Sequence, residues 1–229
     1  MIILDMLAHD DWSRPVYFTT FAGQSSYMGL EKYFRLEGLT YRLVPLNNNQ
    51  STTGLDTRVG TDIMYNNMVN KFRWGNMGSK VYLDENVRRM ASQLRQVTGT
   101  LAQALIEENK KDSALKVLNL CVDSIPNETY PYDVPMVLIA YCYYEAGDIA
   151  KADKLTQIMF DAGESKLRYF HSLEDDARMY YGYEREQMQS MLEKLTALAE
   201  GFDQRNMVED FHFRLAAMLK EHIIVPKQQ

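Results

Sequence analysis

The spacing of apolar residues changes near residue 85. From Asn86 onward apolar side chains recur every three or four positions, which is the period of an amphipathic helix. The stripes comprise Met90, Leu94, Val97, Leu101 and Leu105, then Met188, Met191, Leu192, Leu195 and Leu198, then Phe211, Leu215, Met218 and Leu219. The pattern predicts a mainly α protein with a helical domain over 86–229, whose last helix ends before Pro226.

The first 85 residues predict a small mixed α/β subdomain. Short β-type runs alternate there with helical patterns, and the polar run 47–54 is typical of an exposed loop. We expect Thr61 to cap a helix that places Ile63, Met64, Met68 and Phe72 near one face. The expected strands are Val16–Thr20 and Tyr41–Val44, and the expected helices are Ile2–Ala8, Tyr27–Arg35 and Thr61–Lys71.

Two segments of the helical part resemble each other without gaps. The paired positions lie 38 residues apart, and the pairs are Leu101-Ala102 with Ile139-Ala140, Leu105 with Tyr143, and Ala114 with Ala152. Small residues at these positions let the two helices of a hairpin approach closely, which is the tetratricopeptide pattern. The usual period is about 34 residues, and the surplus falls in the connection 126–132.

The turns of the two hairpins carry matching signals. Asp112 is placed to cap the second helix of the first hairpin, and Gly147-Asp148 supplies a C-terminal glycine followed by an N-cap. Pro126 follows the first hairpin and closes it. Two repeats are too few to bury a solenoid core alone. We therefore expect residues 166–221 to form three further helices, a capping hairpin and a terminal helix.

The repeat register predicts a candidate binding groove. In tetratricopeptide arrays the first helix of each hairpin lines the concave face, and the register of Ala102 and Ala140 selects the residues there. They are Gln103, Glu107, Val137, Tyr141, Tyr144 and Glu145. Aromatic faces beside carboxylates suit a basic or sugar-like ligand better than an anion. The alternative is that the helices of 166–221 fold across this groove and bury it.

Tyrosine is the one compositional excess, with 15 in the chain. Five of them gather around the connection between the hairpins and in the second repeat: Tyr130, Tyr132, Tyr141, Tyr143 and Tyr144. Such a cluster could face a peptide or a sugar. Core packing with the hydroxyls at the surface is the favoured interpretation.

No metal site is predicted. His171, Glu174 and Asp175 have a spacing that would put an imidazole and a carboxylate on one helix face, but no second pair accompanies them. A solvated helix face is favoured there. The run His9-Asp10-Asp11 is better explained as the end of a helix and a turn.

No catalytic residue and no cofactor are predicted either. The segment 23–27 lacks the second glycine of a nucleophile elbow, and Ser113 with Lys116 has Ser-x-x-Lys spacing without its partner motifs. The segment 75–78 lacks the features of a phosphate loop. Cys121 and Cys142 are expected to be small buried hydrophobes. We therefore expect a binding or scaffold role, with an independent hydrolase or transferase as a distant alternative.

Charge and hydropathy narrow the choice of partners. Residues 1–85 carry 8 basic and 9 acidic side chains, and residues 86–229 carry 17 and 22, so nucleic acid is not an expected partner. The longest apolar run, Val134 to Tyr144, is about half the roughly 20 residues of a membrane span. The N-terminus lacks the basic region and cleavage site of a secretory signal.

Several strings of the first 85 residues carry a family resemblance. They are Leu4-Asp5-Met6-Leu7, the run from Trp12 to Phe18, Leu36-Glu37-Gly38-Leu39-Thr40-Tyr41-Arg42-Leu43-Val44-Pro45, the run from Asn70 to Asn76, and Val81-Tyr82-Leu83-Asp84-Glu85. They resemble the C-terminal soluble region of a bacterial family of multi-pass membrane proteins of uncharacterised function that are similar to protein O-mannosyltransferases. The resemblance is looser over the helical remainder, where the family also leads one to expect tetratricopeptide-like repeats.

The resemblance implies an address and a context. A polytopic, glycosyltransferase-like region would precede this segment, which would lie on the extracytoplasmic, periplasmic face of a bacterial inner membrane. Any catalytic residue would belong to that preceding region. The expected partner is then a protein, peptide or glycan, with membrane contact only through the missing N-terminal region. The alternative is a complete, cytoplasmic tetratricopeptide adaptor that binds partner proteins.

Overall fold

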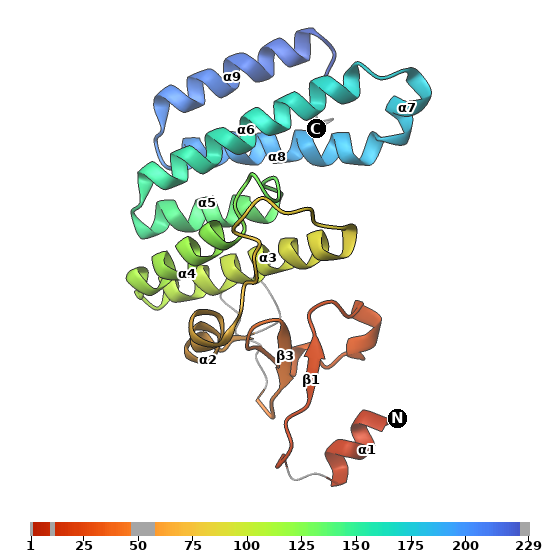
Figure 1. The fold of residues 1–229 in the computed structure, drawn as a ribbon, viewed down its shortest axis with the longest axis vertical. Helices are drawn as coiled ribbons and strands as arrows, with labels where there is room; N and C mark the ends of the chain where they lie inside the picture. Colours follow the sequence, from red (N-terminus) through yellow and green to blue (C-terminus); the bar gives the residue numbers. More distant parts are fainter. Residues whose placement is uncertain (1, 10–11, 47–57, 225–229) are drawn as a thin grey trace.

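The computed structural model describes residues 2–9, 12–46 and 58–224. It is mainly helical, with a small sheet near the N-terminus and a stack of helices that runs to the other end of the molecule (Figure 1). The predicted fold class is thereby confirmed. The polar run 47–54 lies outside the described residues.

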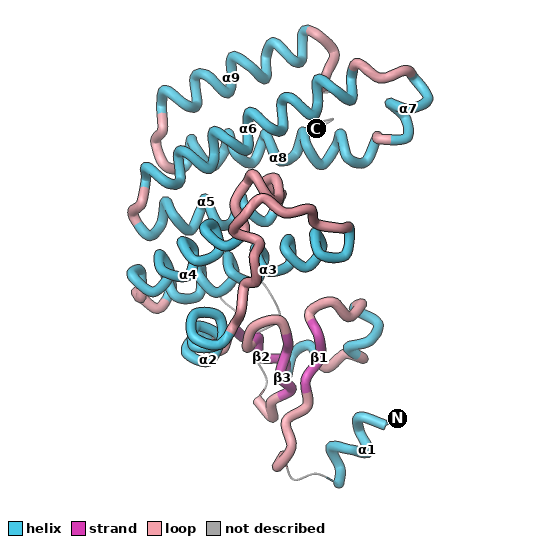
Figure 2. Tube along the Cα trace, viewed as in Figure 1, coloured by secondary structure: helices cyan, strands magenta, loops and turns pink. Residues whose placement is uncertain are grey.

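The N-terminal part begins with α1 (Ile2–His9), close to the predicted helix. A four-stranded sheet follows in the order β1-β3-β2-β4, in which β1/β3 and β2/β3 pair antiparallel and β2/β4 pair parallel. Strands β1, β2 and β3 lie side by side in Figure 2. The strands are β1 (Tyr17–Thr19), β2 (Phe34–Leu36), β3 (Thr40–Leu43) and β4 (Arg58–Val59). The two strands predicted from sequence correspond to β1 and β3.

The helix predicted for Tyr27–Arg35 is wrong. The chain forms two short 3-10 turns, η1 (Gln24–Tyr27) and η2 (Glu31–Tyr33), and then enters β2. Met28 and Gly29 both have positive φ, at 54° and 75°, which ends any helix there. Phe34 is fully buried and its ring stacks on Tyr41 at 5.4 Å. Packing against β3 therefore decides the conformation of this segment over its helical spacing.

The predicted helix over 61–71 forms as α2 (Thr61–Asn66) followed by the π-helical turn η3 (Asn67–Lys71). Gly60, not Thr61, is its N-cap, and the Thr61 hydroxyl instead donates to Glu108 Oε1 at 2.9 Å. Met64 and Met68 are fully buried in the same core cluster as the helices that follow, while Ile63 is exposed. These two methionines join the front of the chain to the helical stack.

Seven helices make up the stack. They are α3 (Glu85–Glu107), α4 (Lys111–Ser124), α5 (Pro135–Ala146), α6 (Ile149–His171), α7 (Asp175–Tyr180), α8 (Gly182–Gly201) and α9 (Arg205–Lys220). Helix α3 packs on α4 and α5, α5 on α6, α6 on α8, and α8 on α9 (Figures 1 and 2). The division into domains 1–85 and 86–229 and the tetratricopeptide assignment stay predictions.

Small residues of the helices are buried in the core. Ala102, Ala114, Ala140 and Ala152 are all fully buried. A methyl group added at Gly99 of α3 would lie 2.9 Å from Leu138 Cδ2 of α5. The close contact of α3 with α5 therefore depends on the absence of a side chain at Gly99.

The turns agree with the sequence at one hairpin and differ at the other. Gly147 ends α5 with a φ of 98°, and the Asp148 side chain caps α6 by accepting from the Lys151 backbone N–H at 3.3 Å. At the first hairpin Lys110 is the N-cap, and Asp112 lies one residue inside α4. There the Asp112 carboxylate complements the positive end of the helix dipole without capping it.

The region expected to cap the array from residue 166 is different in detail. Helix α6 continues to His171, so the three further helices are α7, α8 and α9. Phe160 of α6 stacks on Phe211 of α9 at 3.7 Å. The Arg214 guanidinium lies over the Phe160 ring at 4.7 Å and donates to Asp161 and Glu164. Helices α6, α8 and α9 thus close the end of the array.

The connection between the hairpins is held by a buried arginine. Arg95 of α3 has no exposed surface. Its Nη1 and Nη2 donate to the backbone carbonyls of Ile125, Tyr130 and Pro131 at 2.7–3.0 Å, and Nη1 also donates to Asp133 Oδ1 at 3.0 Å. The guanidinium lies over the rings of Tyr130 and Tyr132 at 4.6 and 5.2 Å. Two of the five clustered tyrosines therefore pack around a buried cation.

Candidate ligand-binding face

Four of the six predicted groove residues lie near the C-terminal ends of α3 and α5, on the side of the stack where α5 turns into α6 (Figure 1). Gln103 and Glu107 lie one turn apart on α3, and Gln103 Nε2 donates to Glu107 Oε1 at 3.4 Å. Tyr141 and Glu145 lie one turn apart on α5. We call the surface formed by Gln103, Glu107, Tyr141 and Glu145 the acidic face.

Tyr141 is the centre of the acidic face. Its side chain is half-buried, and the Glu145 side chain one turn later lies near its hydroxyl. Burial raises the pKa of Tyr141, and the negative charges of Glu145 and Glu107 raise it further. Two carboxylates therefore lie close enough to one phenol to act on it electrostatically.

Phe202 completes the face from a distant part of the sequence. It lies in the turn between α8 and α9, where its ring packs edge-on against Tyr141 at 5.9 Å and stacks on Tyr144 at 4.6 Å. Sequence reasoning missed Phe202, because a single aromatic residue in a turn carries no periodic signal. Part of the predicted groove is thus covered by the helices that follow it.

Tyr144 belongs to the core beneath the face. Only 3% of it is exposed, and its hydroxyl donates to Asp153 Oδ1 at 2.7 Å. Burial raises its pKa, as does the hydrogen bond to Asp153. Tyr144 cannot contact a ligand directly in this conformation, but it holds Phe202 in place. Val137 is half-buried and lies one turn before Tyr141 on α5.

Lysines border the acidic face without covering it. Lys111 Nζ donates to the Glu145 backbone carbonyl at 2.7 Å, which ties the start of α4 to the end of α5. Lys110 pairs with Glu108 and with Asp62 at 2.8 and 2.9 Å, and these hydrogen bonds raise its pKa. These contacts direct Lys110 toward α2 and away from Tyr141.

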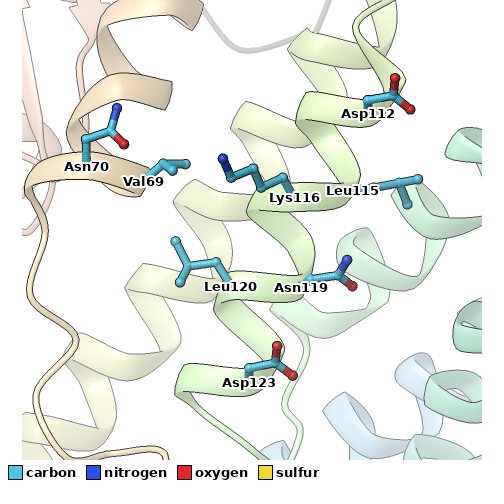
Figure 3. A pocket seen from close by; sticks show the side chains of 8 residues that line it. All are labelled: Val69, Asn70, Asp112, Leu115, Lys116, Asn119, Leu120 and Asp123. Atoms are coloured by element: carbon cyan, nitrogen blue, oxygen red, sulfur yellow. The ribbon is translucent and has the colours of Figure 1, made fainter.

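A shallow depression of about 730 Å³ lies between η3 and α4 (Figure 3). It is lined by Val69, Asn70, Asp112, Leu115, Lys116, Asn119, Leu120 and Asp123. Lys116 and Leu120 extend from α4 toward the segment that carries Val69 and Asn70. The Asn119 amide oxygen already accepts from the Tyr143 hydroxyl and from Lys151 Nζ, both at 2.8 Å. None of the predicted groove residues lies there.

The candidate metal and thiol chemistry is dispersed. His171 ends α6 and Glu174 precedes α7, so the predicted pair does not share one helix. Among the described residues no group of three His, Cys, Asp or Glu side chains is arranged to hold a metal ion. Burial raises the pKa of Cys121 to about 11 and that of Cys142 to about 12, so both thiols stay protonated at neutral pH. His9 ends α1, and Asp10 and Asp11 lie outside the described residues.

No helix among the described residues has the length and hydropathy of a membrane span.

Comparison with known proteins gives one match, to a family model. No curated protein and no solved structure matches the chain. Residues 1–63 match the family described as TMEM260-associated domain 2, which fits the resemblance of this part of the chain to O-mannosyltransferase-like membrane proteins.

Proposed function

We propose that this chain is a non-catalytic interaction module of a membrane glycosyltransferase-like protein, and that it binds a protein, peptide or glycan on the extracytoplasmic side. The observation that carries this proposal is the acidic face, where Glu107 and Glu145 act on Tyr141 and Phe202 packs beside it. The match of residues 1–63 supports the membrane-protein context.

The chemistry of the acidic face favours a particular class of ligand. A tyrosine ring can bind a cation or the C–H face of a sugar through its π-face, and the Tyr141 ring is partly exposed. The carboxylates of Glu107 and Glu145 attract positive charge and accept hydrogen bonds from sugar hydroxyls. A phosphate or another anion would be repelled, so a basic peptide or a neutral glycan fits best.

A binding role is also supported by the structural roles of the polar side chains and thiols near the acidic face. Tyr144, Asp153, Asn119 and Tyr143 form hydrogen bonds that lock helices together. Both cysteines are buried and protonated. These groups act on the structure of the module, since they face the core or one another.

Titration of the complete chain tests the binding site. A manno-oligosaccharide and a lysine-rich peptide would each be titrated by isothermal calorimetry, with a glutamate-rich peptide as the negative control. Tyr141→Ala and the pair Glu107→Gln with Glu145→Gln should each weaken binding, whereas Glu209→Gln on α9 should not. Unchanged binding in Tyr141→Ala and in the Glu107→Gln, Glu145→Gln variant would exclude the acidic face as the binding site. Turnover of either ligand would contradict the non-catalytic role.

The membrane context has its own test. If this chain is part of a larger membrane protein, the coding sequence upstream of Met1 continues into apolar spans of about 20 residues. A stop codon directly upstream, with no such spans, would instead support a free-standing adaptor that binds partner proteins through the same face.

A further inference from the structure

Helix α7 exposes its apolar side chains. This six-residue helix has no buried residue, and its two large apolar side chains are strongly exposed, Met179 at 78% and Tyr180 at 79%. Tyr183 at the start of α8 and Tyr169 near the end of α6 are 68% and 59% exposed. Single exposed apolar residues are ordinary, but a group of large ones around one corner marks an interaction surface.

The aromatic rings at this corner form a connected strip. Tyr169 contacts Phe170 at 5.8 Å, Phe170 stacks on Tyr181 at 5.1 Å, and Tyr181 meets Tyr180 edge-on at 5.1 Å. We call these four residues the aromatic strip. Because each ring limits the movement of the next, little side-chain entropy remains to be lost when a partner binds.

The charges around the aromatic strip are mostly negative. The carboxylates of 174–186 are all exposed, and they belong to Glu174, Asp175, Asp176, Glu184 and Glu186. The same segment holds two arginines, and one of them, Arg178, pairs with Asp175. On the α6 side Lys166 is exposed, and Arg168 pairs with Glu164 and Glu221. The corner therefore carries a small excess of negative charge, which disfavours an anionic membrane or nucleic acid and favours a cationic partner.

The aromatic strip is separate from the acidic face. Helix α6 begins next to the turn that follows Glu145 and ends beside the strip, and its 23 residues span about 34 Å at 1.5 Å per residue. Each surface can therefore be altered without changing the other.

We propose that the aromatic strip, with Met179, Tyr183 and the surrounding carboxylates, is a docking surface for a polypeptide segment rich in lysine or arginine. Apolar side chains of the segment pack on Met179 and Tyr180, and its ammonium or guanidinium groups lie over the tyrosine rings and beside Glu174, Asp176 and Glu184. This surface goes beyond the proposed function, because it serves a second partner or a second part of the same one.

The test uses the complete chain and a fluorescein-labelled peptide of three Lys-Gly-Leu-Lys repeats, followed by fluorescence anisotropy. The same peptide with glutamate in place of lysine keeps the apolar content and reverses the charge. The lysine peptide should bind, and its affinity should fall with added salt. The double variant Met179→Ser with Tyr180→Ser should weaken it about tenfold, while Tyr82→Ser, at an equally exposed tyrosine, should not.

Other results would overturn the proposal. Equal binding of the two peptides, or full binding by the double variant, would show that the aromatic strip does not select a basic segment. Loss of binding in Tyr141→Ala with retention in the double variant would assign the peptide to the acidic face alone. Binding to phosphatidylcholine vesicles without binding to the peptide would make the corner a membrane contact. Self-association that the double variant abolishes would assign it to a second copy of the chain.

Discussion

Arg95 and Asp133 form an ion pair between the middle of α3 and the segment just before α5, with Nη1 and Oδ1 3.0 Å apart. The arginine is fully buried and the aspartate is mostly buried. Because the same guanidinium also donates to three backbone carbonyls, the long connection between the hairpins is fixed to the helical core and does not form a loose loop.

Arg95→Met should strongly destabilise the protein. The change removes the guanidinium that donates to the Asp133 carboxylate and to three carbonyls, and breaking a buried pair costs about 3–5 kcal/mol. Urea unfolding followed by circular dichroism would measure the loss. Arg89→Met, on the exposed side of α3, is the matched control and should change the free energy of unfolding by less than about 0.5 kcal/mol. Equal stability of the two variants would contradict the role of Arg95.

Tyr144→Ala and Tyr141→Ala should separate the core from the candidate surface. Tyr144 is buried against Phe202, so its truncation should cost about 3–5 kcal/mol. Tyr141 is half-buried, so its truncation should cost about 1 kcal/mol and act mainly on ligand binding. Thermal melts and calorimetry of the two variants measure both effects. A large loss of stability in both would make the acidic face part of the core.

Gly99→Ala tests the close contact of α3 and α5. The added methyl group would meet Leu138 at 2.9 Å, and overpacking of this kind costs about 1–3 kcal/mol. The gain in helix propensity offsets about 1 kcal/mol of that loss. Gly201→Ala, where nothing lies within 4 Å, is the control and should not destabilise. In a Leu138→Ala background the loss from Gly99→Ala should be smaller, and a strictly additive double variant would argue against the contact.

The two buried thiols should make the protein less stable in alkali. Their pKa values are raised from 9.0 to about 11 for Cys121 and about 12 for Cys142. A raised folded pKa gives stability that is complete below pH 9 and is lost as the pH rises toward 11–12. Between pH 8 and 10 each thiol should account for a loss of about 1 kcal/mol, and urea titrations at the two pH values measure it.

Substitution of both cysteines by alanine provides the control for this pH effect, since the double variant should show a smaller change between pH 8 and 10. A thiol reagent at neutral pH should react with neither cysteine in the native protein and with both in urea. Rapid labelling of the native protein would place at least one thiol outside the core.

Periodicity predicted the helical elements well and the irregular ones poorly. Helices form over 61–71 and from residue 85 as predicted, and Gly147-Asp148 forms the expected turn. Ile63, Met90 and Leu219 of the predicted apolar faces are exposed. Tyr27–Arg35 did not follow its spacing, because pairing of β2 with β3 and burial of Phe34 stabilise an extended chain. Such pairing is a contact between distant segments, and no local window of sequence contains it.

The candidate site shows the same division. The register of Ala102 and Ala140 places Gln103 and Glu107 on α3 and Tyr141 and Glu145 on α5, and Glu107 lies close enough to Tyr141 to raise its pKa. That these residues form one binding surface stays a prediction. The burial of Tyr144 depends on Phe202, which lies 58 positions later in the chain (202 − 144). The environment of Arg95 likewise depends on the path of a connection that has no period.

Met64 and Met68 give the molecule a mechanical property. Their side chains are anchored in the helical core, and β4, just before α2, pairs with β2. The sheet and the stack are therefore linked by a short segment fixed at both ends, which leaves little room for a hinge between them. A force or rotation applied to the sheet would reach α3 through these two methionines, so the sheet and the stack would move together.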